Sequence, residues 1–347
     1  MHMSPLRRIP LSQFLVHSRQ LLKASIEAKK PLSLVTGNES ADLDSFASSL
    51  LYAYLSSPGP TQSQQSTILP ILPIPRADLN LRPEFIYLLS ELRIPKQDLI
   101  FIDDIPTPIL TGAGGSASAK NEVVLVDHNT LQEKIFPPTK TVVKGVIDHH
   151  KDEGKYLDAG PRIIEVSGSC VSLVTNWGKS KWGDWGNGPG VKEAAKLALA
   201  AILIDTGNMK MRVTPHDRSA VDFLESKLGG GGVGIIGDDE GDASVKEPWN
   251  STNFFLKLSE AKSSLDSLNR VTPTLILGIS SVVKPLSYLT SPCRGGPEAF
   301  LSALSKFAQE RNLDVAAVMP SFTDKATGEF SRELLVWEIS EEFEYAF

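Results

Sequence analysis

The chain has 347 residues, 41 % hydrophobic and 22 % charged, a globular composition with the length for a large core and two domains. Its net charge of −6 argues against broad, non-specific nucleic-acid binding, which needs a basic face. No uninterrupted apolar run reaches membrane-spanning length, and the N-terminus has no apolar signal segment, so we expect neither a membrane span nor secretion. Two distant cysteines, Cys170 and Cys293, indicate reduced thiols in a cytoplasmic protein rather than a disulfide framework.

The first two thirds of the chain alternate short apolar runs with longer amphipathic stretches. Strands are expected at residues 32–35, 99–102, 123–126 and 142–147, each ending at polar residues. Helices are expected at 45–55 and 191–204, the second of which would present Asp205 at its C-terminal end, and a surface loop is expected at 56–66. This order is typical of a parallel α/β sheet flanked by helices, in which ligands bind beyond the carboxyl ends of the strands.

The composition changes at residues 229–250, where glycine and aspartate predominate. We interpret this stretch as an interdomain linker; a glycine-rich phosphate cradle is the alternative, although the GxxxxGK[ST] pattern is missing. Beyond the linker we expect helices at 254–268 and 297–312 and strands at 274–283, 315–319 and 333–337. The sequence therefore predicts a domain over residues 1–228, the linker, and a smaller α/β domain over residues 251–347.

Two aspartates, Asp42 and Asp44, lie in the turn that connects the first expected strand to a helix. Carboxylates at this spacing can bind two different metal ions or chelate one. Aspartate and serine are also ordinary helix-capping residues, so this turn alone is equally consistent with a solvated cap.

The triplet Asp148-His149-His150 directly follows a buried strand and is more specific. His128 lies beside Asp127 at the end of another strand, so that three histidines lie at strand ends near aspartates. A single histidine is usually structural, but this group favours a metal site. Carboxylate and imidazole ligands without thiolates suit Mn²⁺, Mg²⁺ or Co²⁺ better than structural zinc, and several carboxylates can hold two ions ~3.5–4 Å apart.

Four motifs, GNESADLDS, LVDHN, GVIDHH and LIDTGNM, occur in the order and spacing of the DHH phosphoesterase family. The chain resembles the yeast-type exopolyphosphatases most, with family II inorganic pyrophosphatases and prune-type proteins as relatives. The resemblance implies a DHH domain over residues 1–228 and a DHHA2-like, substrate-binding domain over residues 251–347.

The resemblance also implies roles for individual residues. Asp42, with Asn38, would bind a first divalent ion, and Asp127 would bridge both ions. Asp44, His149 and Asp205 would bind the second. His150 would face the substrate phosphate, while His128 and Asp148 would orient the ligands; Asp127, His149 and His150 are the expected catalytic residues. The ions would be Mg²⁺ or Mn²⁺, with Co²⁺ as an alternative.

Asn38 departs from the pyrophosphatase pattern, in which a histidine occupies this position and favours Mn²⁺ or Co²⁺. An amide oxygen is a harder ligand, which shifts the expected preference toward Mg²⁺. Prune-type proteins carry Asp-His-Arg where this chain has Asp148-His149-His150. The triplet, like Asn38, therefore resembles the exopolyphosphatases.

Basic residues that could bind phosphate are less well defined by the sequence. Lys210 and Arg212 follow Asp205 closely. The pyrophosphatases bind phosphate with a Ser-Arg-Lys-Lys run, and Ser331-Arg332 corresponds to its first two residues. Glu333 replaces the first lysine of that run. Lys284 and Arg294 are further candidates, against the general expectation that a lysine or arginine is solvated.

The resemblance implies an exopolyphosphatase in which water activated by two metal ions releases terminal orthophosphate from inorganic polyphosphate, with closure of the second domain bringing Arg332 to the substrate. We expect a monomer that does not act on nucleic acid. The alternatives are an inorganic pyrophosphatase, a prune-like phosphodiesterase, and a non-catalytic partner-binding protein. Asn38 argues against the first, the absence of a GGGH-type nucleotide motif against nuclease activity, and the filled ligand positions against the last.

Overall fold

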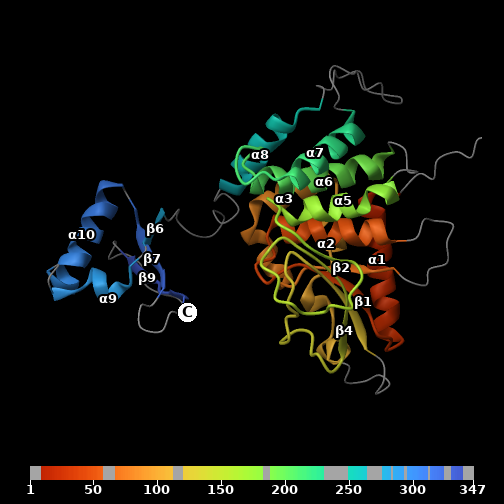
Figure 1. Cartoon of the computed structure of the whole chain (residues 1–347), viewed down its shortest axis with the longest axis horizontal. Coiled ribbons are helices and arrows are strands. Elements are labelled where there is room, and N and C mark those ends of the chain that lie inside the picture. The colour runs from red at the N-terminus through yellow and green to blue at the C-terminus, as the bar shows by residue number, and fades with distance from the viewer. Residues whose placement is uncertain are drawn as a thin grey trace, which may run out of the picture. The chain divides into compact units, whose positions relative to one another are not determined.

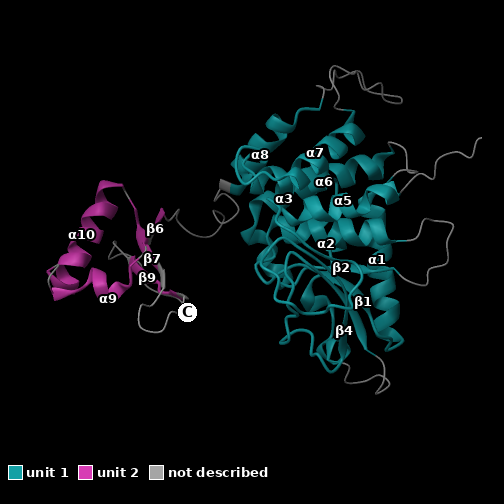
Figure 2. Ribbon diagram, in the orientation of Figure 1, with its two compact units in different colours: residues 1–267 teal, residues 268–347 magenta. Residues whose placement is uncertain are grey.

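The computed structural model describes residues 9–57, 67–111, 120–182, 188–229, 249–263, 276–282, 284–292, 295–311, 313–323 and 330–338. The chain divides into two compact units, residues 1–267 and residues 268–347 (Figure 2). Each unit has its own sheet and its own core. Within the described part of the chain, no helix has both the length and the apolar character needed to cross a membrane.

The first unit is built around a five-stranded parallel sheet with the strand order β2-β1-β3-β4-β5. Its strands are β1 (Ser33–Thr36), β2 (Leu69–Ile71), β3 (Asn121–Val126), β4 (Thr141–Asp148) and β5 (Arg162–Ile164). Its α-helices are α1 (Leu11–Glu27), α2 (Leu43–Ser56), α3 (Pro83–Glu91), α4 (Thr107–Leu110), α5 (Cys170–Trp182), α6 (Pro189–Asp205), α7 (Pro215–Leu228) and α8 (Ser251–Ser263). Three 3₁₀ helices, η1 (Arg76–Leu81), η2 (Lys96–Asp98) and η3 (Ile102–Asp104), complete the described elements.

Both faces of this sheet are buried, and successive residues of a strand contribute to opposite cores because side chains alternate across a strand. In β3, Val124 and Val126 belong to one core and Val123 and Leu125 to the other. The first core contains α2, α5, α6 and α7, which lie over the same side of the sheet (Figure 1). Burial on both faces explains why these strands are continuous apolar runs, as the sequence predicts.

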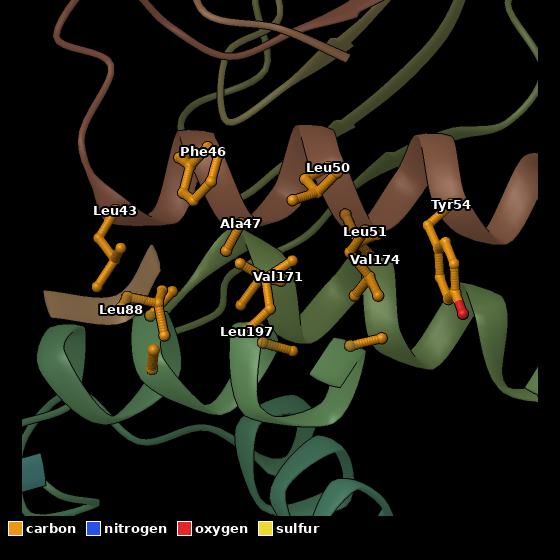
Figure 3. Packing of buried hydrophobic residues seen from close by; sticks show 14 of the residues in the cluster. Leu43, Phe46, Ala47, Leu50, Leu51, Tyr54, Leu88, Val171, Val174 and Leu197 are labelled. Atoms are coloured by element: carbon orange, nitrogen blue, oxygen red, sulfur yellow. The ribbon is translucent and has the colours of Figure 1, made fainter. Parts of the chain in front are cut away.

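Helix α2 is the centre of the larger core. Almost all of its side chains are buried, and Figure 3 shows Ala47 and Leu51 pointing toward Val171 and Val174 of α5. Leu50 is 1 % exposed, and full burial of a leucine contributes about 1.5–3 kcal/mol. Because α2 begins immediately after the polar turn that follows β1, this packing fixes the position of that turn.

The expected strand at residues 99–102 is wrong. Only Phe101 forms a bridge, to Leu72 beyond the end of β2, and the chain then turns into η3. Leu72 bonds to residues 100 and 102, and the preceding residue on the same side of its strand is Pro70, which has no N–H to donate, so the ladder cannot extend in that direction. The short strands β2 and β5, and helices α1, α5 and α7, were not predicted from the sequence.

The second unit contains β6 (Leu277–Val282), α9 (Leu286–Leu289), α10 (Gly296–Glu310), β7 (Val315–Thr323), β8 (Phe330–Arg332) and β9 (Leu335–Glu338). Strand β6 pairs with β7 in parallel, whereas β8 and β9 both pair with β7 antiparallel. Helix α10 contributes Leu304 and Ala308 to a small core against Ala316 and Val318 of β7. The second α/β domain is therefore present with nearly the expected elements.

The border between the two units differs from the expected one. We expected the second domain to begin at residue 251, yet α8 packs on α3 and α6, and its Phe254 and Leu258 belong to the large core of the first unit. Most of the expected linker at 229–250 and most of the expected loop at 56–66 lie outside the described residues.

Candidate metal centre

The candidate site lies where the connections of the sheet reverse direction. From β1 the chain crosses to β2 on one side, whereas β3 leads to β4 and β5 on the other. The carboxyl ends of β1 and β3 therefore meet at the point where ligands usually bind in such sheets. Asn38 follows β1 and Asp127 follows β3 at this point.

The turn after β1 presents both of its aspartates. Asp42 is exposed and caps α2, accepting a hydrogen bond from the backbone N–H of Ser45 at 3.0 Å. Asp44, in the first turn of α2, points inward and is 3 % exposed. Gly37 permits this tight turn, because a Cβ at this position would lie 2.4 Å from the Cβ of Ser45. The expected capping role of Asp42 and the expected placement of both carboxylates at the sheet edge are thus compatible.

Asp127 is the central carboxylate of the group and is 2 % exposed. Its backbone has a φ of 61°, in the left-handed region that non-glycine residues adopt rarely. One carboxylate oxygen, Oδ2, accepts hydrogen bonds from Ser45 Oγ at 2.6 Å and Asn38 Nδ2 at 2.8 Å. The other, Oδ1, lies 3.1 Å from Nε2 of His149 and 3.9 Å from Nδ1 of His150. Asp127 therefore connects the turn after β1 with the histidine pair after β4.

Asp148 is fully buried and organises the histidine pair. Its Oδ1 accepts hydrogen bonds from the backbone N–H groups of His149 and His150 at 2.8 and 3.2 Å, and lies 2.8 Å from Nδ1 of His150. Its Oδ2 accepts a 2.5 Å bond from Nδ2 of Asn129. Nδ1 of His149 contacts the backbone carbonyl of Ser167 at 3.0 Å, which directs Nε2 toward Asp127 and fixes the ring as outer hydrogen bonds do at metal sites.

The buried carboxylates repel one another strongly. Burial, followed by the charges of Asp127 and Asp205, raises the pKa of Asp44 well above its ordinary value. Burial likewise raises the pKa of Asp205 to about 6, with further contributions from Asp42 and Asp127. Burial lowers the pKa of His149, but its hydrogen bond to Asp127 and the nearby carboxylates outweigh this effect and raise the pKa to about 9. The site is therefore a cluster of carboxylates that attracts positive charge.

Divalent cations fit this arrangement. Asp127, His149 and His150 each offer a ligand atom, and these atoms lie within 4.8 Å of one another. Oδ2 of Asp205 is buried and makes no hydrogen bond of normal geometry among the described residues, although Ser169 lies close enough to lower the pKa of this carboxylate and a buried carboxylate oxygen normally has a partner. A cation would satisfy this oxygen and offset the repulsion among the carboxylates, and the donors are of the type that Mg²⁺ and Mn²⁺ prefer.

The structure bears on the expected roles of Asn38 and His128. Asn38 turns its amide nitrogen toward Asp127, while its Oδ1 accepts hydrogen bonds from the backbone and side chain of Ser40 at 2.9 and 2.6 Å. An oxygen ligand from Asn38 would therefore require rotation of the amide. His128 holds its Nδ1 2.9 Å from the carbonyl of Val126, and its buried Nε2 has no partner among the described residues. Burial lowers the pKa of His128, which favours the neutral ring.

The expected phosphate-binding cations are distributed over both units. Arg212 donates from Nη2 to the backbone carbonyl of Asp205 at 2.8 Å, so it lies close to one of the candidate metal ligands. Lys210 is exposed in the same turn. In the second unit, Lys284 and Arg332 are both exposed. Arg294 lies outside the described residues.

Glu333, which replaces a lysine of the pyrophosphatase run, has a structural contact in the second unit. Its Oε2 accepts a 2.6 Å hydrogen bond from the backbone N–H of Leu286, at the start of α9. This contact gives a local reason for an acidic residue at this position.

Several residues that support the site were not predicted. Ser45 and Asn129 hold Asp127 and Asp148, and both lie inside the quoted motifs, where their proximity to the aspartates is a usable signal. Arg82 donates from Nε to the carbonyl of Ala41 at 2.8 Å and from Nη2 to that of Ser40, which holds the turn that carries Asp42. Because every residue has a backbone carbonyl, these bonds could not be predicted from the sequence.

Comparison with known proteins places the chain in a family. The model of the DHH family N-terminal domain matches residues 33–202. A Schizosaccharomyces pombe protein named "Putative exopolyphosphatase" is 34 % identical over 95 % of this chain and 84 % of its own length. The mouse "Exopolyphosphatase PRUNE1" is 32 % identical over 59 % of this chain and 43 % of its own length. A "Probable manganese-dependent inorganic pyrophosphatase" of Streptococcus mutans is 27 % identical over 57 % of this chain and 55 % of its own length. The chain belongs to the DHH family.

Proposed function

We propose that this protein is an exopolyphosphatase that uses two divalent metal ions to release terminal orthophosphate from inorganic polyphosphate. The observation that carries the proposal is the convergence of Asp44, Asp127 and Asp205 with His149 in one cluster at the carboxyl ends of β1 and β3. A phosphoanhydride substrate is highly negative, so a site of this charge can accept it only with cations present.

The chain offers ligands for two ions. Asp42, with Asn38 after rotation of its amide, would hold one ion; Asp44, His149 and Asp205 would hold the other, and Asp127 would contact both. Ions held this way lower the pKa of a water molecule and neutralise charge on the phosphoryl group and the leaving oxygen. The protein itself contributes the placement of these ligands: Asp44 and Asp127 are buried, and both accept hydrogen bonds from neighbouring residues.

His150 is suited to contact the substrate directly. Its side chain is 56 % exposed, and its Nδ1 is held by Asp148, which leaves Nε2 to meet a phosphate oxygen. The hydrogen bond to Asp148 raises the pKa of His150, so that the ring keeps its proton, and its positive charge, to higher pH. A protonated ring can donate a charge-assisted hydrogen bond to phosphate.

The choice of polyphosphate over pyrophosphate rests on Asn38 and on the relatives. Asn38 stands where the pyrophosphatases are expected to carry histidine, and the relative that matches most of the chain is named as an exopolyphosphatase. The manganese-dependent pyrophosphatase of Streptococcus mutans is less similar and matches a smaller part of the chain. Because this pyrophosphatase is nevertheless similar to the chain, pyrophosphatase activity is the principal alternative to exopolyphosphatase activity.

The proposal is tested by orthophosphate release from long-chain polyphosphate, tripolyphosphate and pyrophosphate, and by formation of AMP from cyclic AMP, each with Mg²⁺, Mn²⁺ and Co²⁺. We expect release from the two longer phosphate chains and little or none from the other substrates. Fast release from pyrophosphate with none from longer chains would replace the proposal with a pyrophosphatase. Activity on cyclic AMP alone would indicate a phosphodiesterase.

A further inference from the structure

We infer that Asp217 is a positioning residue of the metal centre, which acts by holding the loop of residues 167–171 against the candidate ligands Asp44 and His149. The inference rests on the proposed function in so far as it concerns catalysis. Its consequence for metal binding can be measured without any substrate.

Asp217 is fully buried in the first turn of α7 and accepts six hydrogen bonds. Its Oδ1 accepts from the hydroxyls of Ser167 and Ser172 at 3.0 and 2.7 Å and from the N–H of Ser169 at 3.3 Å. Its Oδ2 accepts from the N–H of Gly168 at 2.9 Å and from the N–H and hydroxyl of Thr214, both at 2.7 Å. Four of these bonds reach the loop or the first turn of α5, and two serve the cap of α7. That is more than a helix cap requires.

The opposite side of the loop faces the metal centre. The carbonyl of Ser167 is the acceptor that lies 3.0 Å from Nδ1 of His149. The N–H groups of Cys170 and Val171 donate to Oδ2 and Oδ1 of Asp44 at 2.6 and 2.9 Å. Two candidate ligands are therefore oriented by backbone atoms of one five-residue segment. Asp217 holds that segment on the side opposite to these ligands.

Gly168 shows that the loop has no room to shift on this side. A Cβ at Gly168 would lie 2.7 Å from the carbonyl oxygen of Arg212, 2.8 Å from Cγ2 of Thr206 and 3.0 Å from Oδ2 of Asp217. Thr206 directly follows Asp205, the third candidate ligand of the same ion. The loop is thus clamped between Asp217 and the turn that follows α6, and a displacement would reach all three ligands.

The carboxylate at position 217 cannot be replaced by an amide without a conflict. Hydroxyl donors can rotate and accept instead, but backbone N–H groups cannot. Each oxygen of Asp217 accepts at least one backbone N–H, from Ser169 on one side and from Gly168 and Thr214 on the other. In Asp217→Asn, the NH₂ group would face an N–H whichever way the amide turns, although the side chain keeps its size.

The experiment measures Mn²⁺ binding to the full-length, metal-free protein, by the electron paramagnetic resonance signal of free Mn²⁺ and by calorimetry, alongside kcat and KM for tripolyphosphate. For Asp217→Asn we expect one of the two Mn²⁺ binding steps to weaken by about 10–100-fold, the usual cost of losing an outer contact at a metal site. We expect kcat to fall with it, while KM changes less. Gly168→Ala, which pushes the loop from the other side, should have the same signature.

A matched pair of milder variants separates positioning from general stability. Ser167→Ala and Thr214→Val each remove one hydroxyl that donates to Asp217, from the loop and from the cap of α7 respectively. We expect weaker Mn²⁺ binding only for Ser167→Ala, even if both variants lower the melting temperature, and this pair decides the matter if Asp217→Asn does not fold. Equal Mn²⁺ affinity in Ser167→Ala and wild type, or an equal loss in Thr214→Val, would overturn the inference. A wild-type protein that binds Mn²⁺ but releases no phosphate would count against the proposed function alone.

Discussion

The two units of the chain bury their sheets differently. The first unit covers both faces of its sheet, and its large core reaches from α1 to α8. The second unit packs one face of its sheet on α10, while Leu277, Ile279, Met319 and Val336 of its strands are exposed. The candidate ligands all lie in the first unit, and Lys284 and Arg332, two of the cations predicted in the second unit, are exposed. A site that depends on exact distances between charges lies in the unit whose elements are fixed from both sides.

The largest expected effect is on catalysis in the first unit. Asp127→Ala should reduce kcat for tripolyphosphate by at least about 10³-fold, because loss of a mere outer contact already costs about 10–100-fold at metal sites. Circular dichroism and the melting temperature should show that the variant still folds, because the loss of the contacts with Ser45, Asn38 and His149 is offset by relief of the repulsion between Asp127 and the neighbouring carboxylates in the metal-free protein. Asp158→Ala, which removes an exposed carboxylate of the same unit, is the control and should retain wild-type rates. Wild-type activity in Asp127→Ala would show that the central ligand is wrongly assigned.

The next effect compares the two cores. Leu50→Ala should lower the free energy of unfolding of the first unit by about 2–5 kcal/mol, the range for truncating a fully buried leucine. Leu304 is 8 % exposed and belongs to the small core, so Leu304→Ala should cost about 2 kcal/mol, at the low end of that range. Hydrogen exchange read by mass spectrometry reports each unit separately. Equal losses from the two substitutions would show that the two cores do not differ in this respect. A loss of protection in the unit that was not mutated would show that the units do not unfold independently.

Most of the candidate ligands could be predicted to lie close together, because each follows a recognisable element of the sequence. Asp127 and Asp148 end apolar strands, and Asp205 ends an apolar helix. In a two-sided parallel sheet, the carboxyl ends of neighbouring strands meet at one edge, so these residues are brought together by the fold.

The same reasoning could not find the contacts that hold the ligands. Asp217 is 45–50 residues from the loop that it fixes, and that loop holds Asp44 and His149 through backbone atoms, which every residue has. The false strand at residues 99–102 has a related cause. Leu99, Ile100 and Phe101 are buried, but whether they form a ladder depends on the donors of the neighbouring segment, and Pro70 lacks one of them.

A smaller effect concerns the exposed cations of the second unit. Arg332→Ala should raise KM for tripolyphosphate by about tenfold, which corresponds to about 1.4 kcal/mol and to the loss of one charged hydrogen bond. Binding of Mn²⁺ should not change, because every candidate metal ligand lies in the first unit. Arg311→Ala removes the same charge from an exposed position near the end of α10 and should leave KM unchanged. Equal KM values for wild type and Arg332→Ala would remove this residue from the substrate site.

The smallest effect is expected on the exposed face of the second sheet. Val336 is 60 % exposed, whereas Val318, on the face packed against α10, is 3 % exposed. Threonine has nearly the shape of valine and a similar preference for strands, so the substitution mainly tests whether a hydroxyl is desolvated. Val336→Thr should change the free energy of unfolding by less than about 0.5 kcal/mol, and Val318→Thr should cost about 1–3 kcal/mol. Urea denaturation followed by hydrogen exchange in the second unit measures both. A loss above about 1 kcal/mol in Val336→Thr would mean that this face is covered in solution, and the contrast between the two sheets would then disappear.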